Sequence, residues 1–156
     1  MHIRAAAESD IPRLMVLLEQ LFAIEEDFTF SGDLQQRGLE LLMASTGGTV
    51  LVAETDGIVG MICGQIVIST AEGTASLWIE DLVVDRRHRR SGAGTLLLEE
   101  IGRWGRRRGA RRMQLLADRD NGGALEFYRR RGWMTTNLIC LRKQSMEEDD
   151  DSRTDT

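Results

Sequence analysis

The sequence lacks the features that mark several classes of protein. Its 156 residues include two cysteines, one proline and one tyrosine, so a disulfide-stapled secreted scaffold is not expected. No apolar run approaches the roughly 18 residues that cross a bilayer, and the first residues lack the layout of a secretion signal. We therefore expect a cytoplasmic protein without a membrane partner. Its 42% hydrophobic and 29% charged residues are typical of one globular domain with one core.

Candidate metal ligands and nucleophiles are also scarce. Cys63 and Cys140 lie inside apolar runs and are expected to be packed thiols, not a disulfide or a metal site. His2 and His88 have no partners at the spacing of a metal site or of a Ser-His-Asp arrangement. The sequence therefore predicts no bound metal.

Charge is distributed unevenly along the chain. Residues 1–85 carry 3 basic and 14 acidic side chains, whereas residues 86–144 carry 16 basic and 5 acidic ones. Two interpretations stay open: two solvated faces that attract each other, or a basic half that holds a polyanion and an acidic half that collects a cation. Residues 145–156 add six acids and one base, which predicts a disordered acidic tail after a domain of residues 1–144.

Hydrophobic periodicity predicts alternating strands and helices. Asp10 is a candidate N-cap for the first helix, and Asp56-Gly57 is a strong signal for a hairpin turn. The predicted elements are, in order, a strand at 3–5, helices at 10–24 and 33–44, strands at 49–55, 58–69 and 75–84, a helix at 92–107, a strand at 113–117, a helix at 122–131 and a strand at 133–141. This β-α-α-β-β-β-α-β-α-β order predicts an α/β fold with helices around a mixed sheet.

A basic, glycine-containing turn connects the strand at 75–84 to the helix at 92–107. Residues 89–94 read Arg-Arg-Ser-Gly-Ala-Gly. Backbone N–H groups and the helix dipole form an anion site at such a helix start, and arginines add full charge. A Rossmann fingerprint needs a third glycine where Leu97 stands, and a P-loop needs a lysine where the chain has none, its single lysine being Lys143. The turn therefore predicts a pyrophosphate site of another type.

Two segments resemble signatures of the GNAT superfamily of N-acetyltransferases. Residues 89–94 match Arg-x-x-Gly-x-Gly, the loop that holds the coenzyme A pyrophosphate. Residues 121–133 are similar to the second signature, Asn-x-x-Ala-x-x-Phe-Tyr-x-x-x-Gly-Phe, with Trp133 as the final aromatic residue. The resemblance extends from about Ile3 to Leu141. It implies a GNAT-like, mostly antiparallel sheet and an enzyme that transfers an acetyl group from acetyl-CoA to an amine.

The resemblance also implies which residues hold acetyl-CoA. Backbone groups at the end of the strand at 75–84 would bind the pantetheine arm, and Asn121 would hydrogen-bond it or simply cap the following helix. Tyr128 would lie beside the sulfur. The implied cofactor-binding residues are Leu82, Val83, Val84, Arg89, Arg90, Ser91, Gly92, Ala93, Gly94, Thr95, Asn121 and Tyr128.

Acetyl transfer needs a base for the amine and an acid for the departing thiolate, because an amine with a pKa of about 10 is mostly protonated at neutral pH. Glu80 and Asp81 are the candidate carboxylates, and strict alternation lets only one face a given cleft. Residues 78–84 are similar to the corresponding strand of diamine acetyltransferases, which favours Glu80 as base through a water molecule. Asp81 is the alternative base, and Glu80 could instead only order the sheet or bind the substrate cation. Tyr128 is implied as the acid, with plain core packing as its alternative.

The first two helices and the loop between them wall the acceptor site in this family. Here the loop combines acids with aromatic residues, which suits an aliphatic ammonium compound as well as a merely solvated loop. The candidate substrate-binding residues are Glu25, Glu26, Asp27, Phe28 and Asp81. A small primary amine such as a polyamine, an amino sugar or an amino acid derivative is favoured, while a protein N-terminus or lysine stays open.

Other functions stay open as well. The chain could be a non-catalytic module that senses acyl-CoA and regulates a partner, which a blocked acceptor cleft would indicate. The arginines within residues 103–112 could hold the coenzyme A 3′-phosphate, bind nucleic acid, or form a solvated helix end. Interleaved aromatic residues are nearly absent, so no nucleic acid partner is expected. Because family members often pair through their last strands, the resemblance also allows a homodimer.

Overall fold

A computed structural model of the chain describes residues 1–25 and 29–144. The chain forms two compact units, Met1–Asp118 and Arg119–Thr156, and the described part of the second ends at residue 144. The predicted acidic tail at 145–156 lies outside the described residues. The domain boundary expected at residue 144 therefore stays a prediction.

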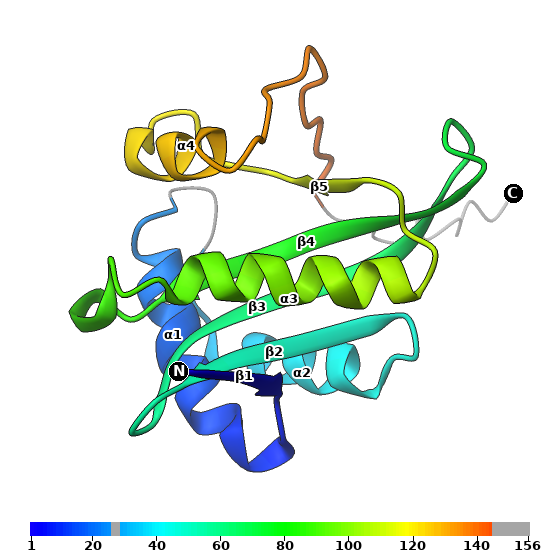
Figure 1. Ribbon diagram of the computed structural model, residues 1–156. Helices are drawn as coiled ribbons and strands as arrows, with labels where there is room; N and C mark the ends of the chain where they lie inside the picture. The colour runs from blue at the N-terminus through cyan, green and yellow to red at the C-terminus, as the bar shows by residue number, and fades with distance from the viewer. Residues whose placement is uncertain (26–28, 145–156) are drawn as a thin grey trace, which may run out of the picture. The chain divides into compact units, whose positions relative to one another are not determined.

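Five strands of the first unit form one sheet in the order β1-β2-β3-β4-β5 (Figure 1). Antiparallel pairing joins β1 (His2–Ala5), β2 (Gly48–Glu54), β3 (Ile58–Ser69) and β4 (Thr74–Val84). Strand β5 (Met113–Leu115) pairs parallel with β4, and the helix α3 (Ala93–Arg107) supplies the crossover that a parallel neighbour requires. The predicted mixed, mostly antiparallel sheet is confirmed.

Helices α1 (Ile11–Phe22) and α2 (Gly32–Ala44) lie on one face of this sheet and α3 lies on the other (Figure 1). Leu14, Leu17 and Leu18 of α1 and Leu39 of α2 are buried in a core with Met61 and Cys63 of β3. The next residue of β3, Gly64, faces α3, where an added Cβ would lie only 2.6 Å from Ile101 Cδ1. A glycine is therefore required there for α3 to pack closely on the sheet.

The entry into α1 differs from the prediction. A short 3-10 helix, Glu8–Asp10, precedes α1, and Asp10 does not cap the helix with its side chain. Its carboxylate instead accepts hydrogen bonds from the Ala7 amide at 2.7 Å and from Arg4 Nη1 at 2.7 Å. The charged Arg4 side chain and the Ala7 amide thus occupy the carboxylate that could have capped α1. Through these hydrogen bonds Asp10 fixes the connection between β1 and α1.

The second unit contains α4 (Gly122–Arg129), close to the predicted helix. The Asn121 side chain accepts a hydrogen bond from the Ala124 amide at 3.1 Å, which confirms the predicted N-cap. The helix is followed by Gly132 at φ 82°, a left-handed conformation that glycine adopts without strain. Within this unit Tyr128 packs against Phe127 and Trp133, with ring centroids 5.3 and 5.6 Å apart.

The strand predicted over residues 133–141 is wrong, because these residues form no strand in the structure. Its large apolar side chains are 74–87% exposed at Met134, Leu138, Ile139 and Leu141. A β-like pattern shows which residues suit a sheet, but a strand forms only where another edge completes its hydrogen bonds. Cys140 is likewise exposed and not packed as predicted, whereas Cys63 is buried. Among the described helices, none combines the length and hydropathy needed to cross a bilayer.

Candidate active site

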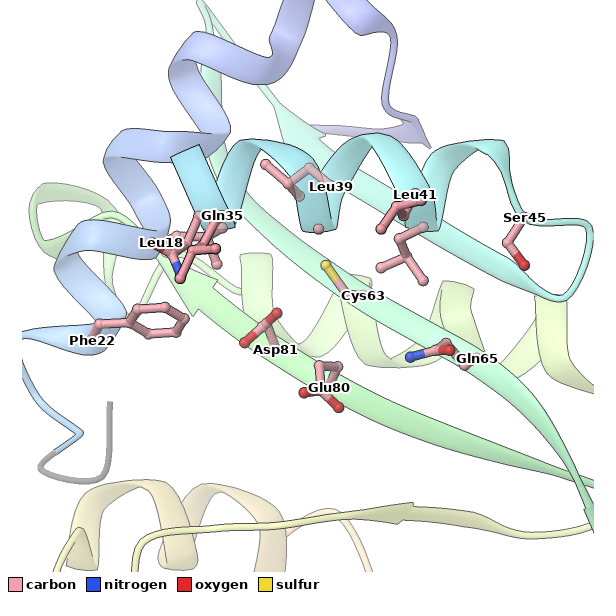
Figure 2. A pocket seen from close by; sticks show the side chains of 13 residues that line it. Leu18, Phe22, Gln35, Leu39, Leu41, Ser45, Cys63, Gln65, Glu80 and Asp81 are labelled. Carbon is pink, nitrogen blue, oxygen red and sulfur yellow. The ribbon is translucent and has the colours of Figure 1, made fainter. Parts of the chain in front are cut away.

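The centre of β4 carries a β-bulge at Glu80. Cys63 of β3 pairs with Asp81, whereas the next residue, Gly64, pairs with Ile79, so Glu80 is an extra residue in the ladder. A bulge breaks the strict alternation of side chains and redirects them. As a result Glu80 and Asp81 line the same cavity (Figure 2). The expectation that only one of them would face the cleft is therefore wrong.

The cavity lies between the bulged part of the sheet and the two N-terminal helices. Its volume of about 360 Å³ suits a small molecule. Strands β3 and β4 supply Cys63, Gln65 and the two carboxylates, and α1 supplies Leu18 and Phe22. Most of the remaining wall is the leucine-rich side of α2 (Figure 2). One end of the cavity is thus acidic and the opposite wall is mainly hydrocarbon.

The half-buried carboxyl of Asp81 is a weaker acid than an ordinary aspartate. Loss of solvation through burial raises its pKa to about 7, and the negative charges of Glu80 and Glu25 act in the same direction. A hydrogen bond with the Cys63 thiol partly opposes this rise. The pKa of Cys63 is itself raised well above its usual value, first by burial and then by the charges of Asp81 and Glu80. Asp81 can therefore exchange a proton near neutral pH, as general acid–base chemistry requires.

The loop from β4 to α3 contains the short 3-10 helix Arg86–His88 and two left-handed residues, Arg90 at φ 61° and Gly92 at φ 88°. The first helical hydrogen bond of α3 runs from the Leu96 amide to the Gly92 carbonyl at 3.1 Å. The amides that precede Leu96 form the helix start, which attracts anions. Arg89 and Arg90 are exposed beside it.

A buried carboxylate anchors this loop to α1. Asp85, 1% exposed, accepts hydrogen bonds from Arg13 Nη2 at 2.6 Å and from the Arg87 amide at 2.9 Å. These bonds hold the pKa of Asp85 well below its usual range. Arg13 also donates to the Ile58 carbonyl at 2.9 Å. This pair was not predicted from the sequence, although an acid placed between a strand and a basic turn is a signal for it.

The end of β4 beyond the bulge lies past its ladder with β5. The pairs between β4 and β5 run only from Leu77 to Ile79. Residues 82–84 continue β4, where Val83 is buried and its two neighbours are half-buried. The backbone of this segment therefore lies beyond the part of β4 that β5 covers.

The remaining predicted residues lie in several places. Glu25 lies in the first unit, where its charge helps to raise the pKa of Asp81. Glu26, Asp27 and Phe28 lie outside the described residues. Asn121 and Tyr128 belong to the second unit. The structure thus brings Glu80 and Asp81 together, and it describes Asn121 and Tyr128 as parts of α4 and its cap.

The arginine-rich end of α3 is partly neutralised by its own helix. Arg103 and Arg107 pair with Glu100 at 2.8 and 3.6 Å. The guanidinium of Arg108 lies 4.2 Å above the centre of the Trp104 ring. These local partners favour the interpretation of a solvated helix end.

Comparisons with known proteins agree with this architecture. The model of the Acetyltransferase (GNAT) family matches residues 16–133. No protein with a curated description matches the chain in sequence.

Similar solved structures include an aminoglycoside 6′-N-acetyltransferase from Acinetobacter haemolyticus, with 21% identity and a TM-score of 0.79 over 94% of this chain and 100% of that one. An aminoglycoside acetyltransferase from an uncultured soil metagenomic sample has 22% identity and a TM-score of 0.73 over 94% and 96%. A transcriptional regulator from Bacillus halodurans has 21% identity and a TM-score of 0.79 over 92% and 99%. These likenesses show the fold, and the family model shows the membership. The chain belongs to the GNAT family of acetyltransferases.

Proposed function

We propose that the chain transfers an acetyl group from acetyl-CoA directly to the primary amine of a small molecule. The observation that carries the proposal is the cavity in which two carboxylates meet at the bulge of β4. The same strand leads into a glycine-hinged helix start flanked by exposed arginines. An acidic acceptor site and an anion site are thus built on one strand.

The residues of this loop fit the pyrophosphate of coenzyme A. The left-handed Gly92 leaves no side chain between the ligand and the first amides of α3, and two arginines add positive charge. The end of β4 past the β5 ladder offers backbone groups to the pantetheine arm. The residues proposed to hold the group are Leu82, Val83, Val84, Arg89, Arg90, Ser91, Gly92, Ala93, Gly94, Thr95 and Asn121. When bound, acetyl-CoA supplies the thioester that carries the acetyl group.

Glu80 is the proposed base. It is exposed at the cavity, so a water molecule can carry the ammonium proton to its carboxylate before the amine attacks. Asp81 is the alternative base, because it lines the same cavity and has a pKa raised to about 7. In either case the second carboxylate holds the cation in place through its charge.

Tyr128 is the proposed acid for the departing thiolate. The proposal follows from its place in the second signature, at the end of α4. Its hydroxyl would donate a proton to the sulfur, whose thiol form has a pKa of about 8.5.

A small amine is proposed as the acceptor over the alternatives. The non-catalytic alternative predicted a blocked acceptor cleft or Glu80 buried in an ion pair, whereas the cavity holds about 360 Å³ and Glu80 is exposed. Two of the similar structures bear names of enzymes that acetylate aminoglycosides, which are small molecules with amino groups. The homodimer stays a prediction.

Steady-state kinetics with acetyl-CoA and a panel of amines test the proposal. We expect Glu80→Gln to lower kcat about 100-fold or more, and Tyr128→Phe to lower kcat with the KM for acetyl-CoA nearly unchanged. If Asp81→Asn had the larger effect, Asp81 would be the base. An unchanged rate in Tyr128→Phe would remove the phenol from the mechanism. Binding of acetyl-CoA without consumption across the panel would contradict the enzyme itself.

A further inference from the structure

We infer that the acceptor is an amine with one ammonium group on a compact hydrocarbon arm, a primary alkylamine or arylalkylamine, and not a polyamine or an amino sugar. The inference rests on the proposed function and names the substrate class of the same site. It is based on the two carboxylates on one side of the cavity, and on the exposed leucines and the glycine that α2 contributes to the other side.

The helix wall of the cavity carries exposed hydrocarbon. Leu34, Gly38 and Leu41 follow one another at i, i+4 and i+7 on α2, and all three line the cavity. Leu34 is 64% exposed and Leu41 is 65% exposed, whereas Leu39, on the core side of the helix, is 3% exposed. An apolar arm in the cavity would remove these leucines from water, which is the favourable term in its binding.

The acidic wall can hold one cation. Glu80 and Asp81 are neighbours at the bulge of β4, and both line the sheet side of the cavity (Figure 2). The ammonium of the acceptor complements this pair in charge. A second ammonium further along the arm would lie among Leu18, Phe22 and the α2 leucines, where it loses water. Among the described lining residues only neutral groups, Gln35, Gln65 and Ser45, could accept its hydrogen bonds there, so its charge would stay uncompensated. The hydroxyls of a sugar would outnumber these three polar side chains, so several would lie against the leucines without a hydrogen bond.

A substitution at Gly38 can test whether the hydrocarbon arm of the amine occupies this part of the cavity. A Cβ at Gly38 would have no atom within 4 Å, so a larger side chain can enter the cavity without a clash. The residue lies inside α2, where glycine is a poor helix former. A leucine at this position therefore fills the space of the arm while the helix is retained.

Kinetics and binding with matched amines form the experiment. Hexylamine and hexane-1,6-diamine differ only in the second ammonium, and 2-phenylethylamine and glucosamine extend the comparison to a ring and a sugar. We expect kcat/KM for hexylamine to exceed that for the diamine about tenfold or more. Calorimetry with free coenzyme A present measures amine binding independently of turnover, and it should give the same order.

Two variants and a control locate the effect. Gly38→Leu should weaken hexylamine binding about tenfold or more, with the KM for acetyl-CoA unchanged. Replacing the exposed Leu34 and Leu41 by glutamine removes apolar surface without filling the cavity, and should narrow the preference for hexylamine over the diamine. The control Gln36→Leu adds the same side chain to α2 at an exposed position that contacts Glu40 and does not line the cavity. It should change neither hexylamine binding nor the preference for hexylamine over the diamine.

The outcomes separate this inference from the proposed function. Equal or better use of the diamine and glucosamine, with Gly38→Leu affecting no amine, would overturn the inference and leave the acetyltransferase standing. Saturable hexylamine binding that Gly38→Leu removes, without acetylation of any amine, would support the inference and contradict the function. Gly38→Leu or the glutamine pair changing the oligomeric state instead of amine binding would show that a second chain covers the leucines, which overturns the inference.

Discussion

Asp81 and Asp85 lie four residues apart, in β4 and just after it, and their surroundings move their pKa values in opposite directions. Asp85 is almost completely buried, and hydrogen bonds from Arg13 and the Arg87 amide hold its pKa well below the usual range. Asp81 is half-buried, and loss of solvation together with the charges of Glu80 and Glu25 raises its pKa to about 7. The carboxylate that is less exposed to solvent is thus the more acidic one.

The difference shows that the groups around a carboxylate, and not its solvent exposure alone, decide its charge state. At Asp85 an arginine compensates the buried charge, and the pair holds the loop at the start of α3 in place. At Asp81 the neighbouring charged groups are themselves acids, so the ionised form is disfavoured until a cation arrives. One carboxylate serves the structure and the other is suited to a cationic ligand.

Arg13→Met should give the largest effect. It leaves the Asp85 carboxylate buried without its main partner, so we expect a loss of about 3 kcal/mol in the free energy of unfolding at pH 7. Because Asp85 fixes the loop, acetyl-CoA affinity should fall too. Urea unfolding and calorimetry measure the two effects. Arg37→Met removes an exposed arginine from α2 and is the matched control. Equal stability of the two variants would contradict the anchoring role.

Asp81→Asn should change stability in the opposite direction. The folded pKa of Asp81, about 7, lies above the ordinary value of 3.8. Below pH 3.8 the carboxyl is protonated in both the folded and the unfolded state, and Asp81 does not reduce the free energy of unfolding. As the pH rises from 3.8 through 7 the unfolded state ionises first, so the free energy of unfolding falls. The amide escapes this loss. The full shift corresponds to about 4 kcal/mol, and because the carboxyl is only half-buried and partly screened by solvent, we expect the variant to be more stable than the parent by about 2 kcal/mol at pH 8.

Thermal unfolding from pH 4 to pH 8 checks the sign of this effect. The difference between Asp81→Asn and the parent should be near zero at pH 4 and grow until about pH 8. Asp56→Asn, at the exposed hairpin turn, should show no such trend. A variant less stable than the parent at pH 8 would show that the folded protein does not disfavour the ionised form of Asp81.

Much of the fold is predictable because its signals are local. Leucines at helical spacing, short apolar runs and the Asp56-Gly57 turn locate the five strands and the three α-helices of the first unit to within a few residues. The strand predicted over residues 133–141 fails for a non-local reason, since the sequence pattern cannot show whether an edge is free to pair with it. The cap at Asn121 is correct because capping depends on neighbours three residues away.

The site is predictable only in part for the same reason. The motif locates the glycine-hinged helix start directly. The bulge at Glu80 is a property of the register between β3 and β4, so alternation within one strand gives the wrong answer. Arg13 and Asp85 are 72 residues apart, and Cys63 meets Asp81 only through strand pairing. These contacts exist only once the chain has folded.

Gly92→Ala should have a smaller effect on stability and a specific effect on the anion site. A φ of 88° is unfavourable for any residue with a Cβ, which predicts a loss of about 1 kcal/mol. The helix start should also bind coenzyme A more weakly, because the loop shifts to relieve the strain. Gly47→Ala, at a turn with no positive φ and no nearby atom, is the control for both measurements. Unchanged coenzyme affinity in Gly92→Ala would separate the loop conformation from pyrophosphate binding.

Apart from its effect on kcat, Glu80→Gln should produce only a small shift in the pKa of Asp81, and this shift tests the cause of the contrast between Asp81 and Asp85. Burial is the main reason for the raised pKa of Asp81 and the charge of Glu80 is the second. Removing that charge should therefore lower the pKa of Asp81 by less than about one pKa unit, which is under about 1.4 kcal/mol. A titration of aspartate carboxyl carbons by NMR follows Asp81 directly, and Glu99→Gln, on the helix that covers the other face of the sheet, should leave it unchanged. A fall to the ordinary value near 3.8 would mean that repulsion, and not desolvation, sets the acidity of the site.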